Sequence, residues 1–219
     1  MNPDRRVAGF GAIAFAVALV VGFSLFGPKG GAYAAAEVAA FLEQPPLNFV
    51  ASIGLIFISS IGLMTVMSYL SEISFGADRN RRVTWAATVV SIAAFLIGWG
   101  LYLAPASSLG SGGPTLDPGL SYAFLSAGMA VVFGVGGAAL GIALLTLALG
   151  GRALPMWVRG AAALAGLAGL LTWVFLAAVA WSPNQWLPGP FYLVILWGLV
   201  IGVWLLIPSS RTDLHHQDR

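Results

Sequence analysis

The sequence predicts an all-α protein, a polytopic bundle of six transmembrane helices with both termini in the cytoplasm. Hydrophobic residues make up 59% of the 219 residues and charged residues only 8%, which is too little charge to cover a water-soluble domain. Apolar segments of about 20 residues recur along the chain, the length that crosses a hydrocarbon core of about 30 Å. They lack the period-two alternation of transmembrane strands, so helices are expected.

The chain is expected to form a single membrane domain, residues 1–219, because no stretch between the spans is long enough for a second one. The predicted spans are residues 7–26, 48–70, 83–103, 121–149, 160–181 and 191–207. Gly27-Pro28 ends the first span, and Gly150-Gly151-Arg152 separates the fourth from the fifth. Residues 71–82 are expected to form a charged loop, residues 104–118 a loop without basic residues, and residues 208–219 a polar tail.

The first outer loop carries two further predictions. Residues 33–44 contain strong helix formers and stop at Pro45-Pro46, which favours a short helix on the outer membrane surface. Ala32-Tyr33-Ala34 also has the form of a signal-peptide cleavage site. The apolar run before it is longer than a typical signal sequence, so we expect the first span to be retained, with cleavage as the alternative.

Small residues indicate how the helices pack. In lipid, helices associate through close van der Waals contact, which small side chains permit. The glycine-rich fourth span is therefore expected to be the central helix of the bundle, packed against the fifth and sixth spans. The alternative for the sixth span is a homodimer face. The glycines concerned are Gly134, Gly137 and Gly141 in the fourth span, Gly166 in the fifth, and Gly198 and Gly202 in the sixth.

The distribution of basic residues predicts the orientation. Nine arginines fall on the side of the two termini, and Lys29 alone falls on the opposite side. This bias predicts cytoplasmic termini and a multi-pass protein of the bacterial cytoplasmic membrane. Arg79, Arg81 and Arg82 lie together between the second and third spans, where a topology signal explains them and binding of anionic lipid headgroups is the alternative.

Ionisable, metal-ligating and catalytic side chains are scarce in the predicted membrane region. None of the six spans contains Asp, Glu, Lys, Arg or His, which argues against a proton-coupled carrier. Cys is absent, no catalytic motif is present, and the histidines, His215 and His216, both lie in the tail. We therefore predict that the protein is not an enzyme and uses no metal or cofactor, and that its partners do not include nucleic acid.

Aromatic residues give the one positive signal for a site. Most Trp and Tyr residues map to the outer half of the predicted bundle, where a belt at the membrane interface is their ordinary role. The alternative is an outward-facing pocket for an apolar or cationic small molecule, a lipid or a quinone. The candidate lining residues are Trp99, Tyr122, Trp173 and Trp197.

Three stretches carry a resemblance to a group of proteins. They are Ala34-Ala35-Ala36-Glu37-Val38-Ala39-Ala40-Phe41-Leu42 in the first outer loop, Leu154-Pro155-Met156-Trp157 between the fourth and fifth spans, and a closing span rich in Trp and Gly. With these features the chain resembles small uncharacterised six-span membrane proteins of actinobacteria. The resemblance covers most of the chain and implies the six-span layout, but it assigns no catalytic residue.

Two functions follow from these observations. The first is a non-catalytic accessory or interaction module whose partners are the lipid bilayer and a membrane protein or a second copy. It predicts a filled interior and an exposed stripe at Gly198 and Gly202. The second is a small facilitator or binding protein, which predicts a cavity reaching Trp173 and Trp197.

Overall fold

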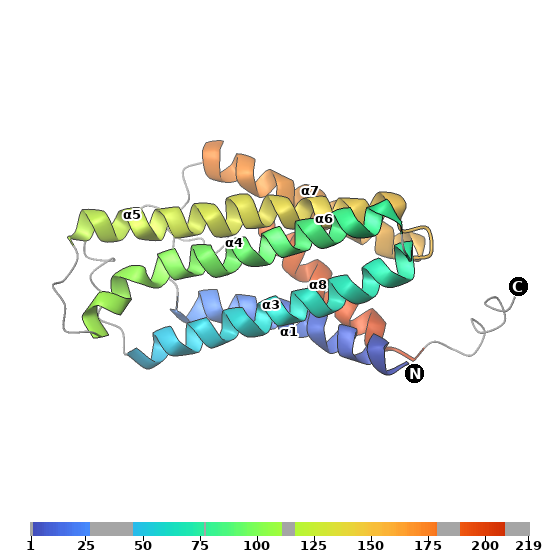
Figure 1. The fold of residues 1–219 in the computed structure, drawn as a ribbon, viewed down its shortest axis with the longest axis horizontal. Coiled ribbons are helices and arrows are strands. Elements are labelled where there is room, and N and C mark those ends of the chain that lie inside the picture. Colours follow the sequence, from blue (N-terminus) through green and yellow to red (C-terminus); the bar gives the residue numbers. More distant parts are fainter. Residues whose placement is uncertain (1, 27–45, 77, 111–116, 179–188, 209–219) are drawn as a thin grey trace, which may run out of the picture.

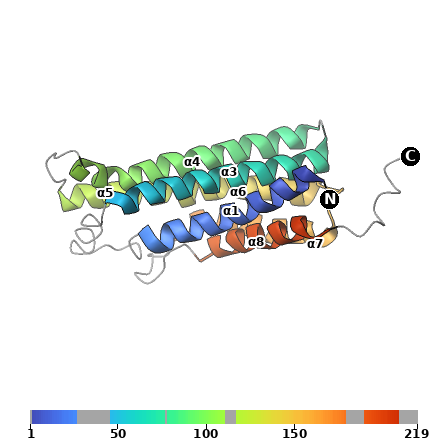
Figure 2. The same ribbon diagram turned by 90° about the horizontal axis from the view of Figure 1, so that it is seen from below.

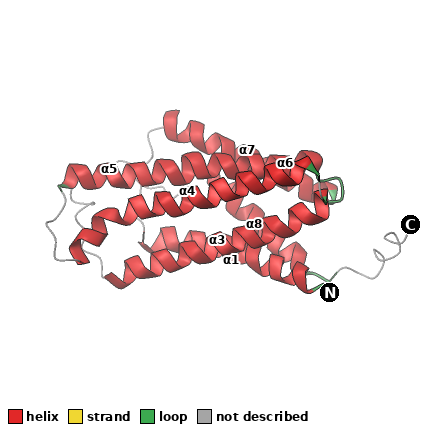
Figure 3. Cartoon of the chain, viewed as in Figure 1, coloured by secondary structure: helices red, strands yellow, loops and turns green. Residues whose placement is uncertain are grey.

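The computed structural model describes residues 2–26, 46–76, 78–110, 117–178 and 189–208, and their regular structure is entirely helical (Figure 3). Eight helical segments lie in these ranges: α1 (Pro3–Phe26), α3 (Pro46–Phe75), α4 (Arg79–Gly110), α5 (Pro118–Met129), η1 (Ala130–Gly136), α6 (Gly137–Gly150), α7 (Met156–Ala178) and α8 (Phe191–Leu206). The segments α5, η1 and α6 follow one another without a break and form one long rod (Figure 1).

The helices form a closed ring, and their order around the ring is their order in the sequence. Each packs on the next in sequence, from α1 through α3, α4, the α5–η1–α6 rod and α7 to α8, and α8 packs back on α1. Figure 2 shows α1 lying between α3 and α8. Successive helices run in opposite directions, so α1 begins and α8 ends at the same end of the bundle (Figure 1). We call this the terminal end and the other the distal end.

Large side chains fill the interior of the ring. Phe15 of α1, Leu63 of α3, Phe133 of η1 and Phe191 of α8 are all fully buried. Aromatic rings meet across four elements, with Phe23 against both Trp99 and Phe133, and Phe133 against Phe191, at centroid separations of 4.5, 5.1 and 5.1 Å. The described part of the bundle is thus a packed core, as the accessory-module hypothesis expects.

Glycines bring neighbouring backbones together around the ring. A Cβ on Gly141 of α6 would stand 2.6 Å from the Gly166 carbonyl oxygen of α7, and one on Gly202 of α8 would stand 3.0 Å from the Gly9 oxygen of α1. The same kind of contact joins Gly98 of α4 to Gly128 of α5 and Gly11 of α1 to Gly62 of α3. Close contact through glycine, which the sequence predicted for the later spans, therefore extends to the first three as well.

The glycine-rich fourth span differs from the prediction in two ways. It is one member of the ring between α4 and α7 and not the centre of the bundle. Its helix also changes to π geometry over Ala130–Gly136. A π segment changes the angular register of the side chains that follow it, and the glycines here lower the steric cost of that change. Gly134 then lies under the ring of Trp173, and Gly136 lies under that of Phe95.

The sixth span also packs differently. Gly198 and Gly202 are buried against α1, where Ala12, Gly9 and Ile13 surround them. The expectation that they pack against the fourth and fifth spans is therefore wrong. Their burial within a single chain is also incompatible with the alternatives in which they form a homodimer face or an exposed stripe.

Several predicted boundaries move outward. The helix of the second span continues to Phe75, and that of the third begins at Arg79 and runs through Pro105 to Gly110. Residues 71–75, 79–82 and 104–110 are therefore helical, where loops were expected. The predicted surface helix at residues 33–44 and most of the tail lie outside the described residues.

The apolar helices identify a multi-pass membrane protein. Five are long and apolar enough to cross a membrane: they contain the stretches Pro3–Phe23, Val50–Phe75, Arg79–Pro105, Gly119–Gly150 and Met156–Val174. The sixth, α8, is apolar but has only 16 residues. At 1.5 Å per residue it rises about 24 Å, less than the thickness of a typical hydrocarbon core.

Candidate functional site

The structure separates the four aromatic residues that the sequence nominated for a ligand pocket. Trp99 and Trp197 are buried in the core, with 2% of each exposed. Trp173 lies on the outside of α7, 52% exposed, with its ring over Gly134, and Tyr122 is exposed on α5. The four residues therefore do not share one pocket. Trp99 lines a cavity between α3 and α4, and ligand binding by any of the four residues stays a prediction.

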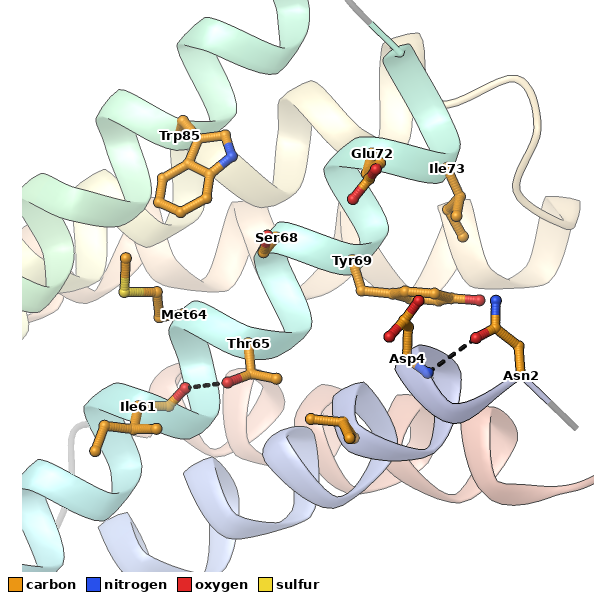
Figure 4. A pocket seen from close by; sticks show the side chains of 11 residues that line it. Asn2, Asp4, Ile61, Met64, Thr65, Ser68, Tyr69, Glu72, Ile73 and Trp85 are labelled. Carbon is orange, nitrogen blue, oxygen red and sulfur yellow. Dashed lines mark hydrogen bonds between the residues drawn. The ribbon is translucent and has the colours of Figure 1, made fainter.

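A polar cavity of the described bundle is a groove at the terminal end, shown in Figure 4. It has a volume of about 630 Å³ and lies between α1, α3 and α4. We call it the acidic groove. Its lining residues are Asn2, which precedes α1, Asp4 and Val7 of α1, Ile61, Met64, Thr65, Ser68, Tyr69, Glu72 and Ile73 of α3, and Trp85 of α4.

The helical repeat of α3 builds most of this groove. Residues three or four apart share one face of a helix, so Ile61, Thr65, Ser68 and Glu72 follow one another along the groove (Figure 4). The Thr65 hydroxyl donates a hydrogen bond back to the Ile61 carbonyl oxygen at 2.7 Å, which satisfies it within its own helix. This stripe changes from apolar at Ile61 to charged at Glu72 as it approaches the terminal end.

Both charged side chains in the lining of the groove are acidic. Asp4 and Glu72 contribute carboxylates, and no lining residue is basic. The backbone amide of Asp4 donates a hydrogen bond to Asn2 Oδ1 at 2.9 Å, which caps the first turn of α1 (Figure 4). Arg5, which follows Asp4 directly, sends its guanidinium to the Trp204 carbonyl oxygen of α8. The groove is thus a local acidic site at the end of the bundle where arginines gather.

The Asp4 and Glu72 side chains are both exposed at this edge of the bundle, so a ligand can reach them from the aqueous side. Tyr69 lies beside them and Trp85 lies across the groove from α4 (Figure 4). Carboxylates and aromatic faces both attract organic cations. The rest of the lining combines apolar side chains, among them Val7 and Ile61, with the hydroxyls of Thr65 and Ser68. The groove therefore offers a cation-attracting end and an apolar end within one cavity.

Arginines at the terminal end bond to the carbonyl ends of neighbouring helices. Arg5 Nη2 donates to the Trp204 oxygen at 3.0 Å, Arg81 Nη1 to the Gly76 oxygen at 3.0 Å, and Arg159 Nε to the Ala148 oxygen at 2.8 Å. Each arginine comes from a helix that begins at this end, and each acceptor lies at the end of a helix that finishes there. These guanidinium groups provide donors for carbonyl groups that have no partner within their own helix. Their positive charge also interacts favourably with the negative C-terminal ends of the helix dipoles.

The three arginines of the predicted cluster Arg79, Arg81 and Arg82 differ in whether they bond to a neighbouring helix. Arg81 is engaged with Gly76, while the Arg79 and Arg82 side chains are exposed in the first turn of α4. Binding of lipid headgroups by this cluster stays a prediction, and the exposed pair is where it would occur.

Sequence reasoning missed the acidic groove because it treated Glu72 as a loop residue. Glu72 instead lies in the last turn of α3, and α1 brings Asp4 to the same cavity. The pattern Ile61, Thr65, Ser68 and Glu72 was a usable signal for a polar stripe at one end of an apolar helix. The partner residues on α1 and α4 required knowledge of the helix order. Among the described residues there is no group of three or more potential metal ligands.

Comparisons with protein families, with curated proteins and with solved structures found no match for this chain. The resemblance to small six-span actinobacterial membrane proteins therefore stays a prediction.

Proposed function

We propose that the protein is a non-catalytic binding protein of the bacterial cytoplasmic membrane, with six spans and both termini in the cytoplasm, and that it holds an amphiphile with a cationic headgroup in the acidic groove. The observation that carries this proposal is the change from charged to apolar lining along the groove. Asp4 and Glu72 lie at one end, and Ile61 and Met64 lie farther along α3.

The chemistry of the lining favours this class of ligand. Two carboxylates without a basic residue in the same lining attract a positive headgroup, and Trp85 and Tyr69 add aromatic faces suited to an ammonium group. The apolar residues then cover an alkyl chain, whose burial supplies most of the binding free energy. With the termini in the cytoplasm, the groove lies at the cytoplasmic edge of the membrane.

The closed and filled ring favours a second candidate, the accessory module that pairs with another membrane protein. Core side chains such as Phe15, Phe133 and Phe191 occupy the interior, which supports a role without transport through the bundle. This candidate is tested by capture of a partner from native membranes. It and ligand binding at the groove are compatible with one another.

Binding of dodecyltrimethylammonium to the protein in lipid nanodiscs tests the proposed function. Isothermal titration calorimetry is run below the critical micelle concentration of the ligand. Removing one carboxylate by Asp4→Asn or Glu72→Gln is expected to weaken binding about three- to tenfold, since an exposed charge pair contributes about 1 kcal/mol.

Asp117→Asn is the matched control. Asp117 lies at the distal end, where its side chain accepts hydrogen bonds from the Gly119 and Leu120 amides, and asparagine preserves such a cap. It changes the net charge by the same amount and is expected to leave binding unchanged. Equal affinities for all three variants and the unsubstituted chain would contradict the proposal.

A further inference from the structure

The acidic groove runs over the outer face of α3 and is open to the surroundings of the bundle. The helix packs on α1 on one side and on α4 on the other, and the groove lies between these two neighbours (Figure 4). Three apolar lining residues, Val7, Ile61 and Met64, are 58%, 64% and 44% exposed. In a membrane, exposed apolar side chains of this kind contact lipid chains. A ligand can therefore enter the groove sideways from the bilayer.

The groove is about as deep as one leaflet of a bilayer. Glu72 at its aqueous end and Ile61 at its inner end are 11 positions apart on α3, which at 1.5 Å per residue is about 16 Å. Half of a hydrocarbon core of about 30 Å is about 15 Å. The α3 lining begins at Ile61, beside which two backbones meet: a Cβ on Gly11 of α1 would stand 3.0 Å from the Gly62 carbonyl oxygen. The groove thus matches the length of a lipid within a single leaflet.

Three kinds of side chain follow one another along this depth. From the aqueous end inward, the α3 lining is charged, then hydroxyl-bearing, then apolar: Glu72, then Ser68 and Thr65, then Met64 and Ile61. The Thr65 hydroxyl already donates to the Ile61 carbonyl oxygen, so the Ser68 hydroxyl is the one of the two that can donate to a ligand. An acyl lipid has the same order of parts, with a headgroup, an ester or amide linkage whose carbonyl accepts hydrogen bonds, and a chain.

The charges of the lining favour a headgroup with a net positive charge. Asp4 and Glu72 repel the phosphate of an anionic lipid, and the lining contains no cation to pair with the phosphate of a zwitterionic lipid. The exposed Arg79 and Arg82 at the same end of the bundle are not part of the lining. Charge therefore selects among lipids that share the same linkage and chains.

We propose that the acidic groove binds an acyl lipid with a net positive headgroup, taken from the leaflet on the side of the termini. This inference rests on the proposed function and names the class of its ligand. The headgroup meets Asp4 and Glu72, the linkage carbonyl accepts a hydrogen bond from Ser68, and one acyl chain covers Met64 and Ile61. A second chain stays in the bilayer, because the groove is open on that side.

Two cationic lipids that differ only in their linkage test this inference. Dioleoyl-trimethylammonium-propane has ester-linked chains, and its ether analogue has the same headgroup and chains without the carbonyl groups. The immobilised protein in maltoside micelles is titrated with each lipid, and the retained lipid is quantified by mass spectrometry against resin without protein. We expect saturable retention of both lipids, with an affinity about two- to tenfold higher for the ester, the contribution of one neutral hydrogen bond.

Ser68→Ala removes the donor and is expected to abolish the preference for the ester lipid while retention of the ether lipid stays unchanged. Ser126→Ala is the matched control, because Ser126 is a half-buried serine of α5 outside the groove lining, and it should keep the preference. Gel filtration confirms that both variants fold. Equal affinity of the unsubstituted chain for the two cationic lipids, or the same preference in both variants, would overturn the inference and leave the proposed function standing.

Two further lipids distinguish that outcome from a failure of the proposed function. Dioleoylphosphatidylethanolamine is zwitterionic and dioleoylphosphatidylglycerol is anionic, and both have the ester linkage. We expect each to be retained less than the cationic ester lipid, and Asp4→Asn to reduce the difference. Equal retention of all four lipids would show that the groove does not select a cationic headgroup, which would overturn both the inference and the proposed function.

Discussion

Arg5 Nη2 donates a hydrogen bond to the Trp204 carbonyl oxygen at 3.0 Å, and the Arg5 guanidinium lies 5.5 Å from the centroid of the Trp204 ring. This contact joins the first turns of α1 to the last turn of α8 and so helps to close the ring. Arg81 and Arg159 make the equivalent contact between α4 and α3 and between α7 and α6. The arginines that indicate topology therefore also cap helices.

Replacing these arginines by glutamine is expected to separate the two roles. Each capping variant should lower the free energy of unfolding by about 1–2 kcal/mol, because a charged hydrogen bond and a favourable dipole interaction are lost. A neighbouring exposed arginine should cost less than about 0.5 kcal/mol. Thermal unfolding in detergent compares the matched pairs Arg5→Gln with Arg6→Gln, Arg81→Gln with Arg82→Gln, and Arg159→Gln with Arg152→Gln. Equal midpoints within every pair would show that the caps contribute nothing.

Substitution of Gly141 tests the close packing of α6 on α7. The new Cβ of Gly141→Ala would lie 2.6 Å from the Gly166 oxygen and 2.9 Å from the Leu170 nitrogen, and these backbone atoms cannot move without separating the helices. We expect a loss of about 1–3 kcal/mol in unfolding free energy. Gly160→Ala, in open space on α7, should instead be neutral or stabilising because alanine favours a helix. The opposite order of the two unfolding midpoints would contradict this packing.

The membrane topology depends on whether α8 crosses the bilayer. Green fluorescent protein fused after Pro208 should fluoresce, because six crossings return the chain to the cytoplasm, where this reporter folds. Alkaline phosphatase fused between α7 and α8 should be active, because five crossings end on the outside. Phosphatase activity of a fusion after Pro208 would mean that α8 does not span the membrane.

The long apolar segments without charge predicted the helices because length and hydropathy alone determine which stretches can cross a bilayer. Gly141 and Gly166 were recognised as packing residues because small side chains have few other uses at that spacing. The partner of Gly202 was not predictable, since the pairing of α8 with α1 joins opposite ends of the chain. The π segment was missed because it has no hydropathy signature.

The candidate site was less predictable than the helices. Trp99 lines a cavity without the other three nominated residues, and Trp173 and Trp197 could not be placed because a sequence does not give the rotation of a helix about its axis. The acidic groove depends on Asp4 of α1 and Glu72 of α3 lining the same cavity, although the first outer loop separates these helices in sequence. Such a site becomes visible only when the order of the helices is known.

The absence of cysteine from the chain allows a direct measurement at the acidic groove. Ser68→Cys places one thiol in the groove lining, and Ala153→Cys places one at an exposed position between α6 and α7. The rate of maleimide labelling is measured for each variant with dodecyltrimethylammonium and with the anion dodecyl sulfate. We predict that the cationic amphiphile slows labelling of Ser68→Cys severalfold, that the anion does so far less, and that Ala153→Cys is unaffected. Equal labelling of Ser68→Cys with and without the cationic amphiphile would contradict binding in the groove.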